Sequence, residues 1–275
     1  MNKLLFLGTL LLCLSNSAKS NAAERNDIPS CYQHADVMEH APTGLKRELF
    51  IAIDQTTRLD DEMRKNVHRQ LNNFGQPGDR ITITTFSAVA DNYTKVAFTG
   101  LFEKLPEKSV SDSMNALKLK RLKRCVANQK NALMSAHVSL KDSFGKLDEN
   151  YPNTELVGAL SDIGNGLVSR SAAERKIVLV VSDMLENSSA LTFYSKGKVR
   201  LQSAEKAYSA IQKANIQTNF GNADVHVIGA GYRLGKVQAN HHSMTQIEKF
   251  WTRLFQDSNA NMVQFGKPNL LTAVN

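Results

Sequence analysis

Two aspartates follow apolar segments that have the composition of buried strands. Asp54 comes directly after residues 49–53, and Asp183 follows residues 177–181 with only Ser182 between them. Continuous apolar runs of this length are typical of strands buried on both faces of a parallel sheet. The carboxyl ends of such strands form the usual binding edge of an open α/β sheet. If the two strands are neighbours, their carboxylates meet at that edge and need a cation, a proton or hydrogen-bond donors, because like charges repel.

Hydroxyl side chains come soon after the first aspartate. Thr56 and Thr57 stand two and three residues beyond Asp54. Carboxylate and hydroxyl oxygens are the ligands that hard cations such as Mg²⁺ take. A simpler interpretation is also open, in which Asp54 and Thr57 only cap the helix that follows. Capping alone leaves the matching aspartate behind the second strand unexplained.

The remaining chain alternates strand patterns with amphipathic helix patterns. Further strands are predicted at 81–86, 225–228 and 262–265, and helices at 59–74, 156–167, 201–211 and 244–255. This alternation predicts the α/β class, as a doubly wound, mostly parallel open sheet with helices on both faces. From about residue 105 to 150 the pattern is helical without a strand, so we expect a helical insertion there.

The order of these motifs resembles that of the von Willebrand factor A (vWA) domain, over about residues 46–266. Asp54 and Thr56 match the first two positions of the family's Asp-x-Ser-x-Ser metal motif. Thr154, which precedes Glu-Leu-Val-Gly-Ala-Leu, matches the loop threonine, and Asp183 matches the second aspartate. The resemblance implies a non-catalytic module that binds another protein at this edge, through a Mg²⁺ (or Mn²⁺) ion held by these four residues.

The chain departs from the family pattern at two positions. Arg58 stands where the family has its second serine, and Met184 stands where it usually has a glycine. The guanidinium can point away from the site, or it can supply the positive charge itself and make a metal unnecessary. We therefore expect a degenerate metal site, with or without its ion. Arg58, Met184, Glu186 and Tyr194 are the predicted partner-binding residues.

An enzyme is the alternative interpretation. A strand that ends in Asp-x-Thr also resembles the start of haloacid-dehalogenase-type phosphatases, which use magnesium. Asp54 would then attack phosphorus, and Asp183 or Glu186 would hold the metal. Those phosphatases usually carry a second carboxylate two residues after the nucleophile, as a general acid, where this chain has Thr56. We therefore prefer the binding module.

A cluster of positive charge lies inside the predicted insertion. It consists of Lys118, Lys120, Arg121, Lys123 and Arg124. These residues can be one solvated face of a helix whose leucines pack inward, or they can contact an anionic membrane surface or another polyanion. Nucleic acid is not an expected partner, because only 7% of the residues are aromatic and a stacking platform for bases is missing.

The N-terminus has the pattern of a secretory signal peptide, which we place at residues 1–22. A basic start and an apolar stretch at 4–14 precede small and polar residues. Residues 23–45 are then a lead-in, and 46–275 form the vWA-like domain with its insertion. After export, Cys31 and Cys125 remain, and in an oxidising compartment such a pair most simply forms a disulfide. We expect a periplasmic or secreted protein, as a component of a cell-envelope assembly.

The composition agrees with a globular protein. The chain has 275 residues, of which 42% are hydrophobic, and a formal net charge of +8. It is too apolar for a disordered chain, and its length suits one large α/β domain or two small ones.

Overall fold

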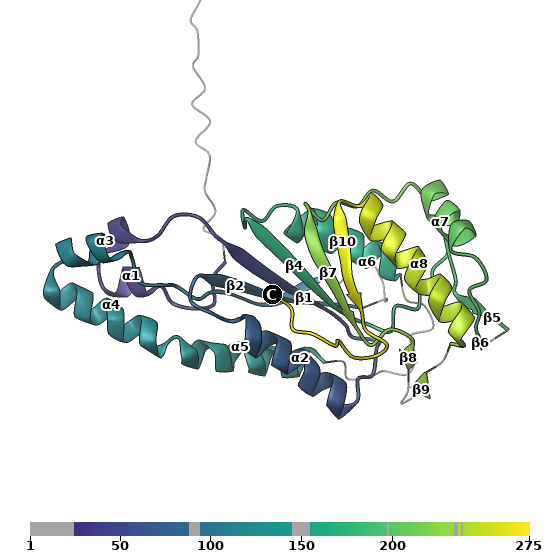
Figure 1. Ribbon diagram of the computed structural model, residues 1–275, viewed down its shortest axis with the longest axis horizontal. Helices are drawn as coiled ribbons and strands as arrows, with labels where there is room; N and C mark the ends of the chain where they lie inside the picture. Colours follow the sequence, from purple (N-terminus) through teal and green to yellow (C-terminus); the bar gives the residue numbers. More distant parts are fainter. Residues whose placement is uncertain (1–24, 88–93, 145–154, 197, 234–235, 238) are drawn as a thin grey trace, which may run out of the picture.

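A six-stranded sheet runs through the middle of the molecule, with helices packed around it (Figure 1). The computed structural model describes residues 25–87, 94–144, 155–196, 198–233, 236–237 and 239–275. The strands of the sheet are β1 (Arg47–Asp54), β2 (Asp79–Phe86), β3 (Lys95–Leu101), β4 (Arg175–Val181), β7 (Ala223–Ile228) and β10 (Ala260–Phe265). Two short hairpins consist of β5 (Tyr194–Ser195) with β6 (Lys198–Val199), and β8 (Tyr232–Arg233) with β9 (Lys236–Val237).

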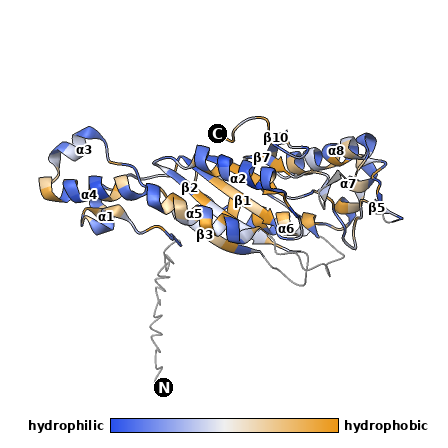
Figure 2. Ribbon diagram, turned by 90° about the horizontal axis from the view of Figure 1, so that it is seen from below, coloured by the Kyte–Doolittle hydropathy of each residue, from blue (hydrophilic) through white to orange (hydrophobic). Residues whose placement is uncertain are grey.

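Five larger helices pack on the two faces of the sheet, and a sixth, α4 (Ala116–Asn128), extends beyond it. The five are α2 (Asp61–Phe74), α5 (Lys130–Ser143), α6 (Leu156–Ile163), α7 (Ala204–Lys213) and α8 (His241–Asp257). Shorter turns are α1 (Cys31–His34), η1 (Met38–His40), α3 (Lys108–Ser113) and the π-helical η2 (Gly164–Val168). One core cluster joins α6, α7 and α8 to one face, and a second joins α2 and α5 to the other. The strands between them are the most apolar part of the molecule (Figure 2).

The strand order is β10-β7-β4-β1-β2-β3, and only β3 runs antiparallel to its neighbour. This is the predicted doubly wound, mostly parallel sheet, and its order is that of a vWA-like α/β fold. From β1 the chain moves outward to β2 and β3, and it later returns to the other side of β1 to add β4, β7 and β10. The order therefore reverses between β1 and β4, where ligands bind in open α/β sheets.

The edge strand β3 was not expected from the sequence. Its alternation of apolar and polar residues is weak, with a half-buried Val96 and a buried Gly100 among them. The lead-in covers its outer edge, since the Asp27 N–H donates to the Thr99 carbonyl at 2.7 Å and the Asn26 side chain accepts from the Leu101 N–H. Covering an edge in this way removes the free backbone groups that promote aggregation.

Helix starts follow the chemistry of their first residues. Asp60, Asn115, Ser203 and Asn240 each accept a hydrogen bond from a backbone N–H in the first turn of α2, α4, α7 and α8. Such caps satisfy amides that have no partner inside the helix.

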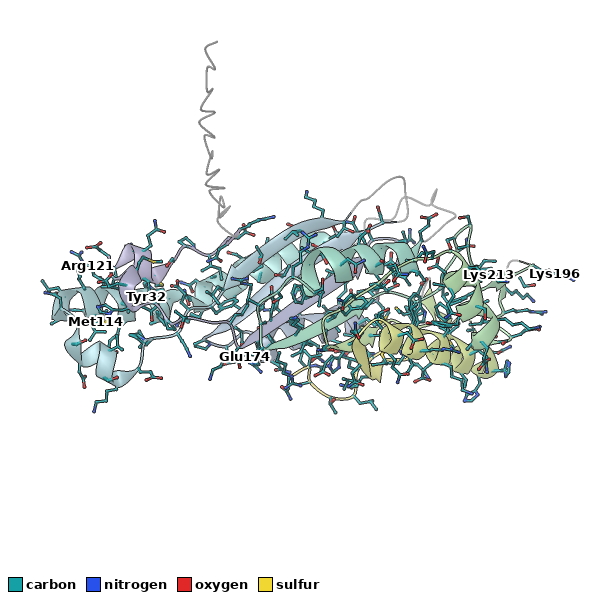
Figure 3. All side chains as sticks on the ribbon, turned by 90° about the horizontal axis from the view of Figure 1, so that it is seen from above. Tyr32, Met114, Arg121, Glu174, Lys196 and Lys213 are labelled. Carbon is teal, nitrogen blue, oxygen red and sulfur yellow. A yellow bond between two sulfur atoms is a disulfide. The ribbon has the colours of Figure 1, made fainter. Side chains whose placement is uncertain are left out.

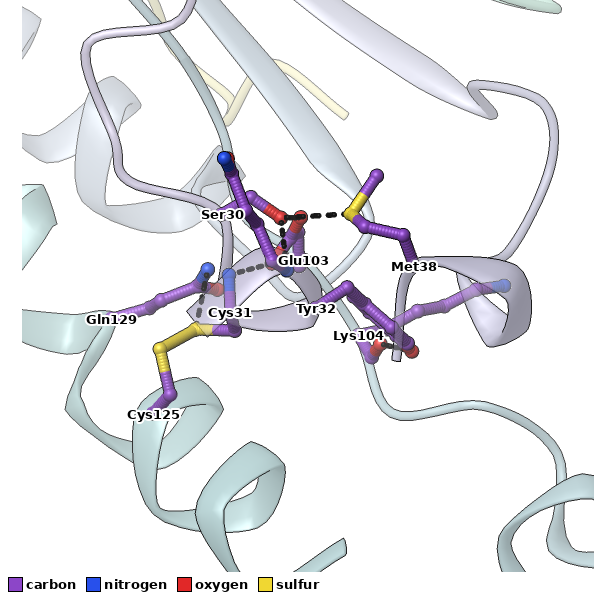
Figure 4. Close-up of a disulfide and its surroundings, with 9 residues drawn as sticks. Ser30, Cys31, Tyr32, Met38, Glu103, Lys104, Cys125 and Gln129 are labelled. Atoms are coloured by element: carbon purple, nitrogen blue, oxygen red, sulfur yellow. Dashed lines mark hydrogen bonds between the residues drawn. A yellow bond between two sulfur atoms is a disulfide. The ribbon is translucent and has the colours of Figure 1, made fainter. Parts of the chain in front are cut away.

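Helices α1, α3 and α4 form an arm that extends beyond the sheet (Figure 1). The predicted disulfide is confirmed: Cys31 of α1 and Cys125 of α4 are bonded, with Cα atoms 5.4 Å apart. Around the bridge, Glu103 accepts from the Cys31 N–H at 2.6 Å, and the Tyr32 hydroxyl donates to the Lys104 carbonyl (Figure 4). The disulfide is consistent with an extracytoplasmic location.

The domain boundaries assigned above stay predictions. Residues 1–24 lie outside the described residues. The described part of the predicted insertion is helical, in α3, α4 and α5. Among the described residues, no helix has both the length and the apolar character needed to cross a bilayer.

Candidate functional site

The ends of β1 and β4 lie side by side, as the sequence predicted for the two aspartates. The strands are parallel neighbours, and Ile53 stands opposite Val181. The residues that follow, Asp54 on one strand and Ser182 with Asp183 on the other, therefore meet at the carboxyl edge of the sheet. Because this is also the point where the strand order reverses, the topology delivers both acids to the expected binding edge.

The carboxylate of Asp54 is completely enclosed by hydrogen-bond donors. Its Oδ1 accepts from the Thr56 N–H at 2.8 Å and from the Thr56 hydroxyl at 2.6 Å. Its Oδ2 accepts from the Thr57 hydroxyl at 3.0 Å and from the Ser182 hydroxyl at 2.8 Å. Only 1% of the Asp54 surface is exposed. Four donors match the four acceptor positions that a carboxylate offers.

Burial raises the pKa of the Asp54 carboxyl above its ordinary value, although the hydrogen bonds from Thr56, Ser182 and Thr57 act in the opposite direction. The network therefore compensates the buried charge only in part. The bond from Ser182 crosses between the two strand ends, and it ties the turn after β1 to the end of β4.

Asp183 connects three segments of the same edge. Its N–H donates to the Thr57 hydroxyl at 3.1 Å, and its Oδ1 accepts from the Leu185 N–H at 2.9 Å. Its carbonyl accepts from the Gly231 N–H, just beyond β7, at 2.8 Å. The nearby Gly229 has a φ of 103°, and a side chain there would lie 3.0 Å from the Ser182 carbonyl. Glycine is therefore required for this close approach of β7 to β4.

Met184 has a backbone conformation that is rare for residues other than glycine. Its φ is 58°, in the left-handed region that glycine favours. The side chain is fully buried in the core cluster with α8. The indole N–H of Trp251 donates to the Met184 carbonyl at 2.9 Å, and the Met184 N–H donates to the Ser182 hydroxyl. These contacts hold Met184 in its strained backbone conformation.

Glu186 is an acid in the interior of the site. It is 1% exposed, and its Oε2 accepts from the Val157 N–H in the first turn of α6 at 2.8 Å. Burial raises the pKa of this carboxyl to about 7, although hydrogen bonds from Ser188, Val157 and Leu156 oppose the rise. Glu186 thus fastens the loop after β4 to the start of α6.

The other predicted residues have different surroundings. Arg58 is exposed, and Thr56 and Tyr194 are half-buried, the latter in the short hairpin β5–β6. Thr154 lies outside the described residues. Met184 and Glu186 support the edge from within, so a partner would reach their side chains only if the loop after β4 opened. Their role in partner binding stays a prediction.

Two hydroxyls of the network were not assigned to the site from the sequence, namely Thr57 and Ser182. Both stand next to an assigned residue, and both donate to the same oxygen of Asp54. Hydroxyl residues directly beside a strand-end aspartate are the sequence signal that would have found them.

The described residues fit a cation of the vWA type poorly. All four acceptor positions of Asp54 are taken by protein donors, and the second hydroxyl of the family motif is Arg58. In the part of the chain that the structure describes, no three His, Cys, Asp or Glu side chains converge as metal ligands. Binding of Mg²⁺ would require Thr56 or Ser182 to turn away from Asp54. The assignment of the four metal ligands stays a prediction.

The geometry does not favour the phosphatase alternative. An aspartate that attacks phosphorus needs an accessible oxygen with a free lone pair. Both oxygens of Asp54 are buried and accept two hydrogen bonds each. Thr56, at the place of the general acid, donates a hydrogen bond from its hydroxyl to the Asp54 carboxylate.

No family model and no curated protein matches the sequence. Several solved structures are similar at low identity. An aerotolerance-related membrane protein from Bacteroides fragilis is 12% identical, with 80% of this chain and 92% of that chain covered and a TM-score of 0.37. BatB from Bacteroides thetaiotaomicron is 14% identical, with 81% and 91% covered and a TM-score of 0.38. The pilus adhesin SpaC from Lactobacillus rhamnosus GG is 11% identical, with 81% and 28% covered and a TM-score of 0.38. These likenesses do not assign a function.

Proposed function

We propose that the chain is an exported, non-catalytic module of vWA type that binds another protein at the carboxyl edge of its sheet. The observation that carries the proposal is the network centred on Asp54, which joins the ends of β1 and β4 at the reversal of the strand order. A binding surface gains affinity when it is held rigid before its partner arrives. Here the hydrogen-bonded network is buried, and Arg58, four residues after Asp54, is exposed.

The chemistry of the edge indicates how a partner would be recognised. In a vWA domain the resemblance implies a cation that meets a carboxylate of the partner. Arg58 brings a permanent positive charge to the corresponding segment, and a guanidinium binds carboxylates through two parallel hydrogen bonds. We therefore propose that Arg58 takes over this role, with Tyr194 on the hairpin as a second contact.

Site-specific photo-crosslinking tests the proposal. A photoreactive amino acid is placed at Arg58 in the native host, and the matched control carries it at Glu174, an exposed residue just before β4 at the opposite edge of the sheet. We expect a discrete crosslinked protein from position 58 and none from position 174. Equal crosslinking from both positions, or none from position 58, would contradict the proposal.

The cation is tested separately by thermal unfolding with and without Mg²⁺ or Mn²⁺. If the degenerate site binds an ion, the melting temperature rises, and Thr56→Val and Asp183→Ala abolish the rise. If the melting temperature does not change with either ion, the metal-site hypothesis is rejected, and the proposal for Arg58 is unaffected. The two experiments therefore distinguish a failed metal site from a failed binding edge.

A further inference from the structure

The exposed face of α4 and α5 carries a surface that the carboxyl edge does not explain. The two helices are nearly continuous, because Gln129 between them keeps a helical backbone with φ −63° and ψ −17°. Residues spaced alternately by three and four fall on one face of such a helix. The outer stripe at this spacing consists of Leu117, Lys120, Arg124, Ala127, Asn131, Met134 and Val138, and all seven are exposed.

The charge of this face has one sign. Residues 116–130 contain six basic residues and no acidic one. Lys118 is occupied inside the arm, because its Nζ donates to the carboxylate of Asp36 at 2.6 Å and to its carbonyl. Lys120, Arg121, Lys123 and Arg124 are exposed. Arg121 projects at the far end of the molecule from Lys196 and Lys213 (Figure 3).

Large exposed apolar side chains lie on α4, on α5 and in segments next to the arm. Among the described residues, seven large hydrophobic side chains are exposed, and five belong to the arm, to α5 or to the segments that flank them: Met38, Leu105, Leu117, Met134 and Val138. Leu117 is 71% exposed and stands one turn from both Lys120 and Arg121. Met134 and Val138 are 66% and 59% exposed. The inward leucines of α4 are already used, since Leu122 is fully buried and Leu119 packs beside it.

We propose that this stripe, together with Arg121 and Lys123, binds the surface of an anionic lipid bilayer. Lys and Arg side chains are attracted to anionic headgroups, and the interspersed Leu, Met and Val reach the acyl boundary, as in interfacial helices. A second copy of the chain is a poor occupant, because two such faces would bring like charges together. A soluble acidic partner would satisfy the charges but would leave the apolar side chains in water.

The position of the arm determines how the protein would be oriented on a bilayer. Because β3 is antiparallel, its end at Leu101 pairs with Arg80 at the start of β2, so the chain enters the arm from the amino edge of the sheet. Asp54 lies at the opposite, carboxyl edge. The arm and the hairpin β5–β6 lie at opposite ends of the molecule in Figure 1. An arm resting on a bilayer would therefore leave the carboxyl edge accessible.

Vesicle flotation tests the proposal with the protein that starts at Ala23, so that the apolar segment at residues 4–14 cannot bind lipid itself. The probes are vesicles of phosphatidylcholine alone and vesicles containing about one third phosphatidylglycerol. We expect binding to the anionic vesicles that weakens with salt. The charge variant replaces Lys120, Arg121, Lys123 and Arg124 by Gln. It should bind about 600-fold more weakly, since each of the four basic residues contributes about fivefold near an anionic surface.

Two further variants distinguish a bilayer from a soluble polyanion and from an effect of net charge alone. Leu117→Gln/Met134→Gln/Val138→Gln keeps every charge and should still lose about tenfold or more in binding. The matched control replaces the exposed Lys196, Lys198, Lys206 and Lys213 by Gln and should bind within about threefold of the unmodified protein. Circular dichroism confirms that each variant folds.

Three results would overturn the proposal. The first is the absence of binding to anionic vesicles at about 0.1 M salt. The second is an equal loss of binding in the lysine control, which would mean that net charge alone matters. The third is unchanged vesicle binding by the apolar variant together with equally tight binding of heparin, which would identify a soluble polyanion as the ligand. None of these results bears on the carboxyl edge.

Discussion

The buried carboxyl of Glu186 gives a prediction that depends on the interior of the site and on no partner. Burial raises its pKa from 4.5 to about 7, while the unfolded chain returns it to its ordinary value. Between these two values the folded protein keeps a proton that the unfolded chain has released. The free energy of unfolding therefore falls as the pH rises through this window, and above it the contribution is constant.

The magnitude follows from the difference between the two pKa values. Each pH unit between them changes the free energy of unfolding by about 1.4 kcal/mol. Between pH 5 and pH 8 the contribution of Glu186 is thus a loss of about 2.5 kcal/mol, which is a large share of the stability of an ordinary domain. The side chain is 1% exposed, so solvent screening reduces this figure little.

Urea unfolding at several pH values, with Glu186→Gln beside the unmodified protein, measures the effect. Glutamine keeps the size of the side chain and does not titrate. Replacing the carboxyl by an amide also changes the free energy of unfolding by an amount that does not depend on pH. The quantity to compare is therefore how the difference in free energy of unfolding between the two proteins changes with pH. We expect the stability of the unmodified protein, relative to the variant, to fall by about 2.5 kcal/mol from pH 5 to pH 8.

A matched control is Glu62→Gln, whose side chain is 68% exposed at the start of α2. Its stability curve should run nearly parallel to that of the unmodified protein. If the curve of Glu186→Gln is also parallel, the pKa of Glu186 is ordinary and the reasoning from burial is refuted. A difference that grows in the opposite direction would mean that the hydrogen bonds from α6 outweigh burial.

Three further predictions concern other parts of the molecule. The double variant Cys31→Ser/Cys125→Ser should be about 4–5 kcal/mol less stable to urea, because the bridge spans a sequence separation of 94 residues, and thiol titration of the unmodified unfolded protein should find no free thiol. The His68 and His137 Nδ1 atoms lie 2.8 Å apart, and burial lowers the pKa of both, so the stability that the pair contributes should fall as the pH drops below about 6.5. Urea unfolding should show this as a loss of stability of the unmodified protein relative to His68→Gln/His137→Gln. Asp54→Ala should lower the free energy of unfolding by about 3 kcal/mol, since it leaves buried hydroxyls without an acceptor, and an effect below about 1 kcal/mol would contradict the network.

Much of the architecture could be predicted because apolar periodicity is a local property of the sequence. The runs at 49–53 and 177–181 became β1 and β4, and the predicted helices lie where the stripes indicated. The disulfide could be predicted by counting, since only two cysteines follow the predicted signal peptide. The strand β3 could not, because an edge strand needs no continuous apolar run.

The candidate site, too, could be predicted only in part from the sequence. The residue types Asp54, Thr56 and Asp183 indicated the correct edge, since strand direction brings parallel carboxyl ends together. The sequence could not show that Asp54 is saturated by four donors. It also could not show that Met184 and Glu186 are buried, because burial depends on α6 and α8, which are distant in the sequence.

The sequence by itself determined the fold class, the disulfide and the pair of strand-end acids, because these follow from local pattern and from residue count. Tertiary structure alone decided which groups surround each acid, and hence the raised pKa of Glu186 and the enclosed state of Asp54. It also decided that four of the five clustered basic residues stay exposed while Lys118 pairs with Asp36. The physical reason is that solvation and hydrogen bonding depend on neighbours in space, and segments far apart in the chain supply those neighbours.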